Sequence, residues 1–148
     1  MLLVETYVAP VKGKGIGLFA KVLIPRGTIY WRRNEAFDRL FTPDILSTFP
    51  GNVIDYIQKY GFQEASGNWY LCGDNARFTN HSQAPNFINH FDESGLVDYC
   101  FTDRDIAAGE EIVCNYFDTC QSCASGLPFE EVLNWISDFL TSSITFSI

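Results

Sequence analysis

Turns centred on glycine and proline divide this chain into short segments, and this spacing limits the folds that it can adopt. Such turns occur at residues 13–15, 25–27, 49–51, 66–68 and 108–109. Between them lie apolar and β-branched runs that are typical of short strands, at residues 2–8, 17–20, 28–31, 96–102 and 111–116. The pattern predicts a mainly β domain of the β-rich α+β class.

Two longer stretches have the apolar spacing of amphipathic helices. The first covers residues 43–60, with Thr42 as its cap and Pro43 in its first turn, and Pro50 followed by Gly51 should break it. The second covers residues 128–140, where two glutamates occupy the first turn. Because helices and strands do not alternate, a doubly wound nucleotide-binding fold is disfavoured.

Composition and charge narrow the functional classes. A chain of 148 residues with 47% hydrophobic residues indicates one packed domain. Its formal net charge of -8 would repel nucleic-acid phosphates, so direct nucleic-acid binding is not expected. The same charge would attract a basic protein or peptide, although acidity that serves only solubility is an equal alternative. No apolar run approaches the roughly 18 residues of a membrane-spanning helix, so no membrane partner is expected.

Cysteine usage and the first residues bear on the compartment. The chain has 5 cysteines, an odd number that cannot all pair with one another. The opening residues lack the long apolar run of a secretory signal. We therefore expect reduced thiols and an intracellular location, in the cytoplasm or the nucleus. The oligomeric state is not predicted.

Two segments carry glycines and polar residues suited to ligand binding. Gly15 and Gly17 flank Ile16, and such a pair lets the main chain come close to a ligand, although it more often forms only a turn. Asn80 and His81 lie in the run RFTNHS of residues 77–82 and offer hydrogen-bond donors and acceptors. The alternative is a polar loop with local side-chain to backbone bonds.

A third segment, GEEIVCNY at residues 109–116, is a turn followed by an apolar strand that ends in Tyr116. A tyrosine can line an apolar slot while directing one hydroxyl, or it can simply pack in the core. Together and in this order, the three segments resemble the motifs of SET-domain protein lysine methyltransferases. In that comparison Pro85 and Asn86 complete the middle motif, and the resemblance extends from about residue 11 to residue 117.

The resemblance implies a β-clip-like fold of small sheets with a pseudoknot, a helical insert and a C-terminal helix. The SET domain would cover residues 1–120, and residues 121–148 would form a helical extension resembling the segment that follows other SET domains. That extension would cover the cofactor, with Phe129 or Trp135 against the adenine. The cofactor would be S-adenosylmethionine. Its methionine part would contact the backbone of Gly15, Ile16 and Gly17.

The resemblance also implies roles for the Asn-His pair and for the lysine channel. Asn80 would bond the amino or carboxylate end of the cofactor, and the backbone of His81 would bond the adenine. Tyr116 would be the catalytic residue, with its hydroxyl aimed at the methyl-transfer site. A second tyrosine would line the substrate channel: Tyr60 is our candidate by spacing, with Tyr56 and Tyr70 as alternatives.

Cys114 occupies the position two before the catalytic tyrosine, where many members of the family have tyrosine or phenylalanine. A cysteine is smaller than either and bonds weakly, so Cys114 would leave room in the substrate channel for a growing methylammonium group. We therefore predict di- or trimethylation. An aromatic residue from elsewhere, such as Phe87 or Tyr99, could fill the space and reverse this.

The sequence departs from the family at the zinc cluster of many members. Gln83 stands where those proteins have a cysteine, and Cys120 and Cys123 are followed by no further cysteine or histidine. A zinc site needs about four ligands, so no metal is predicted, although Cys114 or a partner chain could contribute to one.

The expected function is methyl transfer from S-adenosylmethionine to lysine side chains of a histone-like or other basic protein. Two alternatives remain open from the sequence. The chain could be a catalytically silent SET fold that binds peptides, or it could methylate a small amine. Retention of Asn80, His81 and Tyr116 favours the enzyme over the silent module.

Overall fold

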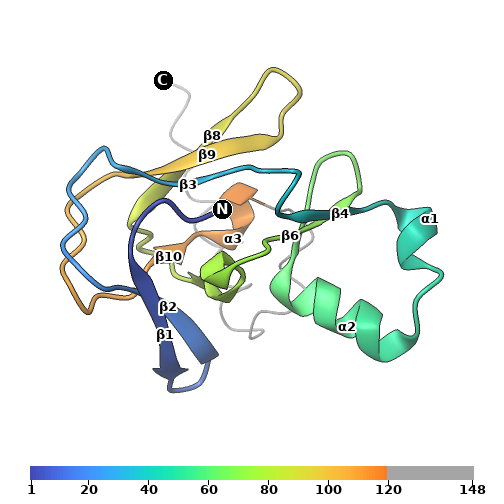
Figure 1. Cartoon of the computed structure of the whole chain (residues 1–148), viewed down its shortest axis with the longest axis horizontal. Helices are drawn as coiled ribbons and strands as arrows, with labels where there is room; N and C mark the ends of the chain where they lie inside the picture. Colours follow the sequence, from blue (N-terminus) through green and yellow to red (C-terminus); the bar gives the residue numbers. More distant parts are fainter. Residues whose placement is uncertain (120–148) are drawn as a thin grey trace, which may run out of the picture.

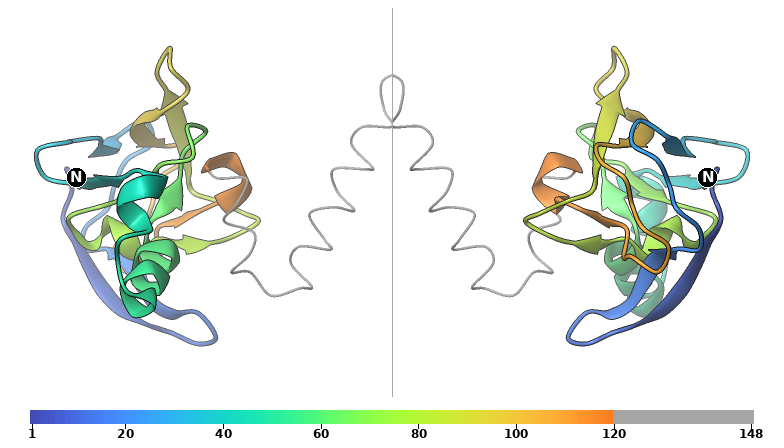
Figure 2. Two further views of the ribbon diagram at one scale, coloured as in Figure 1. Left: turned by 90° about the vertical axis from the view of Figure 1, so that its right-hand side faces the viewer. Right: turned by 90° about the vertical axis from the view of Figure 1, so that its left-hand side faces the viewer.

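The computed structural model describes residues 1–119, which form four small sheets around one core. Three sheets are antiparallel and one is parallel. Figure 1 shows the insert with helices α1 and α2 on one side of the molecule, away from the β1–β2 hairpin. Two side views place that hairpin and the turn between β8 and β9 at opposite ends (Figure 2).

The first half of the described chain contains six strands and the two helices of the insert. The elements are β1 (Thr6–Val11), β2 (Gly15–Ala20), β3 (Ile29–Arg32), β4 (Arg39–Phe41), α1 (Pro43–Leu46), α2 (Gly51–Tyr60), β5 (Phe62–Gln63) and β6 (Trp69–Leu71). The second half contains the 3₁₀ turn η1 (Asn75–Phe78), β7 (Asn80–His81), β8 (Phe87–Phe91), β9 (Val97–Thr102), β10 (Val113–Cys114) and α3 (Tyr116–Thr119).

Strand order shows which distant segments meet. β1 pairs with β2, β9 lies between β3 and β8, and β6 lies between β4 and β5. The remaining sheet pairs β10 with β7 in parallel, with Val113 opposite Asn80 and Cys114 opposite His81. This contact joins segments far apart in sequence, at the Asn-His segment near which the resemblance implies a pseudoknot.

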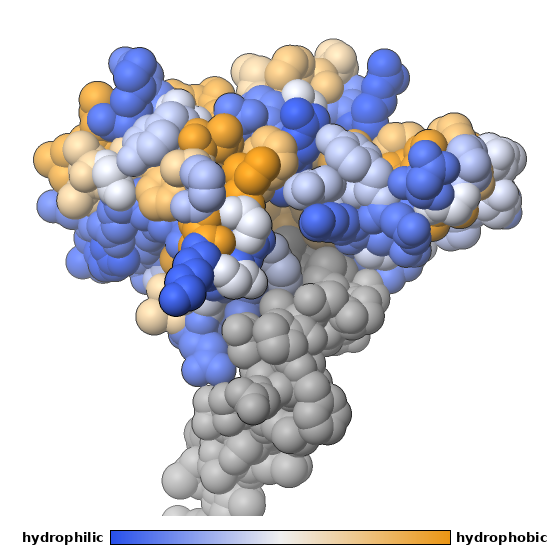
Figure 3. Space-filling view, turned by 90° about the horizontal axis from the view of Figure 1, so that it is seen from below, coloured by the Kyte–Doolittle hydropathy of each residue, from blue (hydrophilic) through white to orange (hydrophobic). Residues whose placement is uncertain are grey.

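The core fills the space between the sheets. Its buried side chains are Leu18, Ala20, Ile24, Tyr30, Trp31, Tyr70, Cys72, Phe87, Val97, Cys100, Ile106, Ile112 and Cys114. Burial of this apolar area is the main favourable contribution to folding. Seen from below, the surface mixes apolar and polar residues rather than showing one continuous apolar face (Figure 3). Within residues 1–119, no helix is long and apolar enough to cross a membrane.

The expected elements agree with the structure in kind and differ at several boundaries. The helix expected at residues 43–60 is two helices, α1 and α2, and the predicted break lies at residues 47–50, where Pro50 is the N-cap of α2 and Gly51 is its first residue. Thr42 caps α1 by accepting a hydrogen bond from the Ile45 amide, 3.3 Å away. The strand expected at residues 2–8 is β1, which begins at Thr6. The helix expected at residues 128–140 lies outside the described residues.

The strand expected at residues 111–116 is wrong at its end. β10 stops at Cys114, and Tyr116 begins the short helix α3. Asn115 is the physical reason, because its side-chain oxygen accepts a hydrogen bond from the Phe117 amide at 3.1 Å. Its backbone oxygen accepts another from the Asp118 amide. Asparagine commonly turns the chain in this way, so Tyr116 lies on a turn rather than on an extended strand.

Candidate functional site

The two glycines of the first motif serve different physical purposes. Gly15 has a φ of 88°, a left-handed conformation that glycine adopts without a steric penalty, and it closes the β1–β2 turn. Gly17 is in ordinary strand conformation, but a Cβ there would lie 2.6 Å from Glu111 Oε1 and 2.7 Å from Val11 Cγ2. Gly17 is therefore required by the close approach of other side chains to β2.

Asn80 connects β2 to the segment that carries the third motif. Its side-chain Nδ2 donates to the carbonyl oxygen of Ile16 at 3.2 Å and to Glu111 Oε1 at 2.8 Å. The structure thus brings together residues from all three motifs. Glu111, which had been given no role, lies at their junction.

His81 is buried and holds the backbone at the start of α3. Its Nδ1 accepts a hydrogen bond from the Tyr116 amide at 3.1 Å, and the two rings lie 5.3 Å apart. Its carbonyl oxygen accepts a hydrogen bond from Lys14 Nζ at 2.8 Å. The imidazole therefore positions Tyr116, and Lys14 bridges the glycine turn to the Asn-His segment.

Tyr116 is placed by contacts at both ends of the residue. Its hydroxyl donates to the Thr79 carbonyl oxygen at 2.9 Å. Burial raises the pKa of the Tyr116 phenol well above its usual range, and nearby Cys114 and Glu111 raise it further. The hydroxyl therefore stays protonated near neutral pH, where it can donate or accept a hydrogen bond but cannot act as a phenolate base.

The tyrosines proposed for the substrate channel differ in their surroundings. Tyr60 ends α2, and its ring lies 5.4 Å from Phe78, the neighbour of the Thr79 carbonyl that Tyr116 contacts. Tyr70 is fully buried and donates its hydroxyl to Asp38 at 2.6 Å, so it belongs to the core. Tyr60 stays our prediction, and Tyr56, with its ring 4.9 Å from that of Tyr60, lies beside it.

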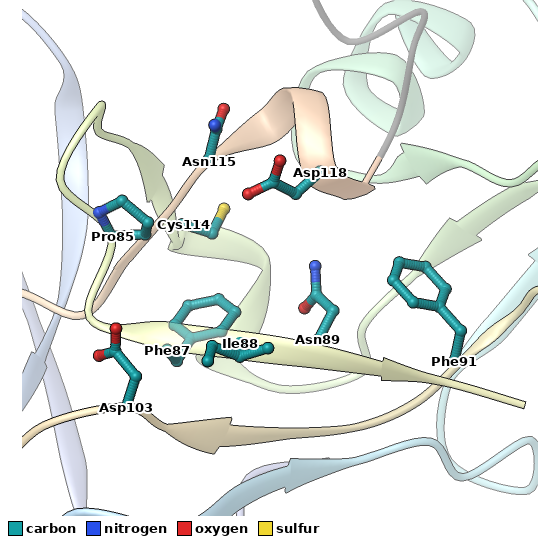
Figure 4. Close-up of a pocket in the computed structure, with 9 residues that line it drawn as sticks. All are labelled: Pro85, Phe87, Ile88, Asn89, Phe91, Asp103, Cys114, Asn115 and Asp118. Carbon is teal, nitrogen blue, oxygen red and sulfur yellow. The ribbon is translucent and has the colours of Figure 1, made fainter. Parts of the chain in front are cut away.

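Cys114 lines a cavity of about 240 Å³ between β8, β10 and α3. Figure 4 shows its sulfur and the Asn89 side chain turned toward the space between the strands. The wall consists of Pro85, Phe87, Ile88, Asn89, Phe91, Asp103, Cys114, Asn115 and Asp118. The cavity is smaller than the roughly 300–1,000 Å³ of common small-molecule sites, so it suits a side chain better than a whole cofactor.

The Cys114 thiol is not chemically activated. Burial raises its pKa to about 12, and the carboxylate of Asp118 adds to the effect. A thiol with a raised pKa is a poor nucleophile and a poor metal ligand near neutral pH. Cys114 therefore contributes shape to the cavity rather than reactivity.

Asn86 is a structural residue whose role the sequence did not reveal. It is fully buried, its Nδ2 donates to the Glu111 carbonyl oxygen at 2.8 Å, and its Oδ1 accepts from the Val113 amide at 3.0 Å. These bonds hold the third motif beside the second. The available signal was its position after Pro85 in the middle motif, but its partners are distant in sequence.

Comparison with known proteins identifies the fold around this site. A family model described as "SET domain" matches residues 15–117, which include all three motifs. The chain belongs to the SET domain family. The resemblance inferred from the motifs is thereby confirmed, and the four small sheets confirm the expected β-rich fold.

One curated relative of this SET domain is the histone-lysine N-methyltransferase set5 of Schizosaccharomyces pombe. The two are 30% identical in an alignment of 137 residues that covers 75% of this chain and 41% of the relative. The chain thus matches less than half of the length of that protein.

Two solved structures share the SET domain fold. One is a humanized mutant of the Chaetomium thermophilum Polycomb Repressive Complex 2 bound to the inhibitor GSK126, with a TM-score of 0.58 and 22% identity over 84% of this chain and 16% of that chain. The other is a candidate histone methyltransferase of Plasmodium falciparum, with a TM-score of 0.53 and 18% identity over 78% of this chain and 95% of that chain.

SET domain methyltransferases generally use S-adenosylmethionine, and the polar groups at the junction of the motifs fit its charged methionine end. Gly15 and Ile16 are exposed residues, and Lys14 supplies a cation beside His81. Asn80 offers a carbonyl oxygen, since both of its N–H groups already have partners. Acceptor, donor and cation thus lie around one exposed turn, as an amino acid ligand requires.

Proposed function

We propose that this chain transfers a methyl group from S-adenosylmethionine to lysine side chains of a basic protein. The observation that carries the proposal is the pairing of β7 with β10. This pairing places Asn80 and His81 beside the strand that leads to Tyr116. Groups suited to the cofactor and the candidate catalytic hydroxyl therefore meet at one contact.

The cofactor, when bound, supplies an electrophilic methyl group to an amine. The protein contributes alignment and a controlled environment. Tyr116 holds a neutral hydroxyl at a place set by the Thr79 carbonyl and the His81 ring. A lysine amine, whose free pKa is near ~10.4, must lose its proton before it can accept the methyl group.

The substrate side of the proposal rests on charge. The cavity beside Cys114 contains the carboxyl groups of Asp103 and Asp118 and no cationic side chain among its described residues. Asp103 Oδ1 is buried and has no hydrogen-bond partner within residues 1–119. Together with the net charge of -8, these groups favour a basic protein segment over a neutral small amine.

The test is incubation with labelled S-adenosylmethionine and a panel of histones, other basic proteins and small amines, read by mass. Label on lysines of a basic protein supports the proposal. Label confined to small amines would favour the alternative that the chain methylates a small amine rather than a protein. Cofactor binding without any transfer would favour a silent peptide-binding module.

Tyr116→Phe separates catalysis from folding in the same assay. The variant keeps the ring and removes the hydroxyl, so we expect turnover to fall about 10²–10³-fold, as for other lost catalytic hydrogen-bond donors. Stability should fall by only about 1 kcal/mol, the typical worth of one hydrogen bond. Near wild-type turnover in the folded variant would rule out the catalytic assignment.

A further inference from the structure

The orientation of the Asn80 carboxamide is decided by its two partners. The Ile16 carbonyl oxygen and Oε1 of Glu111 accept the two hydrogen bonds of this side chain. The group between them, 3.2 Å from Ile16 O and 2.8 Å from Glu111 Oε1, must therefore be the NH₂ group. Both of its hydrogens are used, so the amide cannot rotate without losing two bonds.

The Asn80 carbonyl oxygen is what remains for a ligand. Neither described hydrogen bond of this side chain uses Oδ1, and no residue of the described part donates to it. A carbonyl oxygen accepts hydrogen bonds and attracts cations, whereas a carboxylate placed against it is repelled. Asn80 therefore suits the ammonium end of an amino acid, not its carboxylate end.

Glu111 is placed by the backbone rather than by Asn80. Its residue bridges Phe19 of β2, and the next amide, that of Ile112, donates to the Leu18 carbonyl at 2.8 Å. The missing Cβ of Gly17 leaves the space that the carboxylate enters. The carboxylate is thus held at a fixed place from which it can orient another side chain.

We propose that Glu111 is a positioning residue that fixes Asn80 with its carbonyl oxygen toward the α-ammonium group of S-adenosylmethionine. The inference rests on the proposed function, since it concerns how the same site recognises its cofactor. It assigns a role to the second glutamate of the third motif. The role requires that residue 111 carry a hydrogen-bond acceptor on a side chain long enough to reach Asn80.

The experiment measures binding by calorimetry, without turnover. The probes are S-adenosylhomocysteine and an analogue in which hydrogen replaces its α-amino group, and the readout is the ratio of their Kd values. The wild-type protein should bind the deaminated analogue about 10–100-fold more weakly, the usual worth of a hydrogen bond to a charged group. A second analogue lacks the carboxylate but keeps the α-amino group, so it should still form the hydrogen bond to the Asn80 carbonyl oxygen.

Three substitutions of Glu111 separate the effect of side-chain length from the effect of charge. Glu111→Gln keeps a carbonyl acceptor at the same distance, so it should retain most of the wild-type ratio. Glu111→Asp keeps the charge but withdraws it by one methylene, so its ratio should fall toward one, as should that of Glu111→Ala. Glu110→Gln is the matched control, because the Glu110 side chain contacts Arg104, the Ala107 amide and, at 3.5 Å, Asn86 Nδ2, but not Asn80, and its ratio should equal that of the wild type.

The outcomes distinguish a failure of the positioning role of Glu111 from a failure of the proposed function. A wild-type ratio near one overturns the inference but leaves the proposed function standing, whereas absence of any binding to S-adenosylhomocysteine argues against the proposed function itself. A ratio retained in Glu111→Asp and lost in Glu111→Gln would show that charge, not positioning, matters. If Glu111→Ala does not fold, the Gln and Asp pair still gives the comparison.

Discussion

At the scale of the residue, the candidate catalytic group is defined by what surrounds it. The Tyr116 ring is held by the His81 imidazole, and its hydroxyl by the Thr79 carbonyl. Because burial raises the phenol pKa, Tyr116 contributes a fixed neutral dipole across the neutral pH range. The pH dependence of turnover should therefore follow the substrate lysine, which must lose a proton before it can react.

Cys114 leads to a prediction about the number of methyl groups. Of the two aromatic residues that could fill its space, Phe87 lines the same cavity, whereas Tyr99 stacks on His90 with ring centroids 4.3 Å apart. Phe87 has no hydroxyl that could restrain an amine. We therefore expect the wild-type protein to add two or three methyl groups, as measured by mass spectrometry of a saturated reaction.

Two substitutions test this prediction. Cys114→Tyr adds both bulk and a hydroxyl and should shift the product toward one methyl group. Cys114→Phe adds bulk alone and should still permit more than one. A wild-type product that stops at one methyl group would contradict the prediction, as would identical products from the two variants.

At the scale of the element, strand β2 shows how one motif combines a fold requirement with a binding requirement. Its first glycine turns the chain back from β1, and Gly17 lets two side chains approach the strand. The turn depends on backbone conformation, whereas the approach depends on the absence of a side chain.

Alanine substitutions should separate these two requirements. Gly15→Ala places a Cβ in the left-handed region and should lower the free energy of unfolding by roughly 1–2 kcal/mol. Gly17→Ala displaces the flexible end of Glu111, so its main effect should be weaker binding of S-adenosylhomocysteine with less discrimination against the deaminated analogue. Denaturant unfolding and calorimetry measure the two effects. Loss of ammonium discrimination in Gly15→Ala alone would contradict the assignment.

At the scale of the whole molecule, acidity is the property most relevant to the substrate. The formal net charge is -8, and two carboxyl groups lie in the wall of the cavity beside Cys114. Electrostatic attraction between exposed charges is screened over about 10 Å at 0.1 M ionic strength. A basic substrate should therefore be captured less well as salt is added.

Salt should raise the KM for a basic peptide much more than the KM for the cofactor. The control peptide keeps the target lysine and replaces its flanking lysines and arginines by neutral residues. Its KM should depend only weakly on ionic strength. Equal salt dependence for both peptides would show that the acidic surface does not guide the substrate and serves solubility alone.

Local patterns were sufficient to predict the β-rich class, the interrupted helix and the three motifs. Proline cannot occupy a helix interior without losing a backbone hydrogen bond, so Pro50 rules out one continuous helix, and the positive φ at Gly15 is a property of one residue in one turn. The order of the motifs, with Asn80 and His81 between the glycine turn and Tyr116, was sufficient to identify the family. These features depend on neighbours in sequence, so spacing alone reveals them.

Contacts between distant segments decided the rest. Glu111 orients Asn80 across 31 positions of the chain, Asn86 holds Val113 across 27, and Gly17 is required because Glu111 packs against it. The end of β10 before Tyr116 is different, because it depends on a local side-chain bond between Asn115 and Phe117. No spacing in the sequence predicts the distant pairs, because they exist only after β7 and β10 have paired and brought the two segments together.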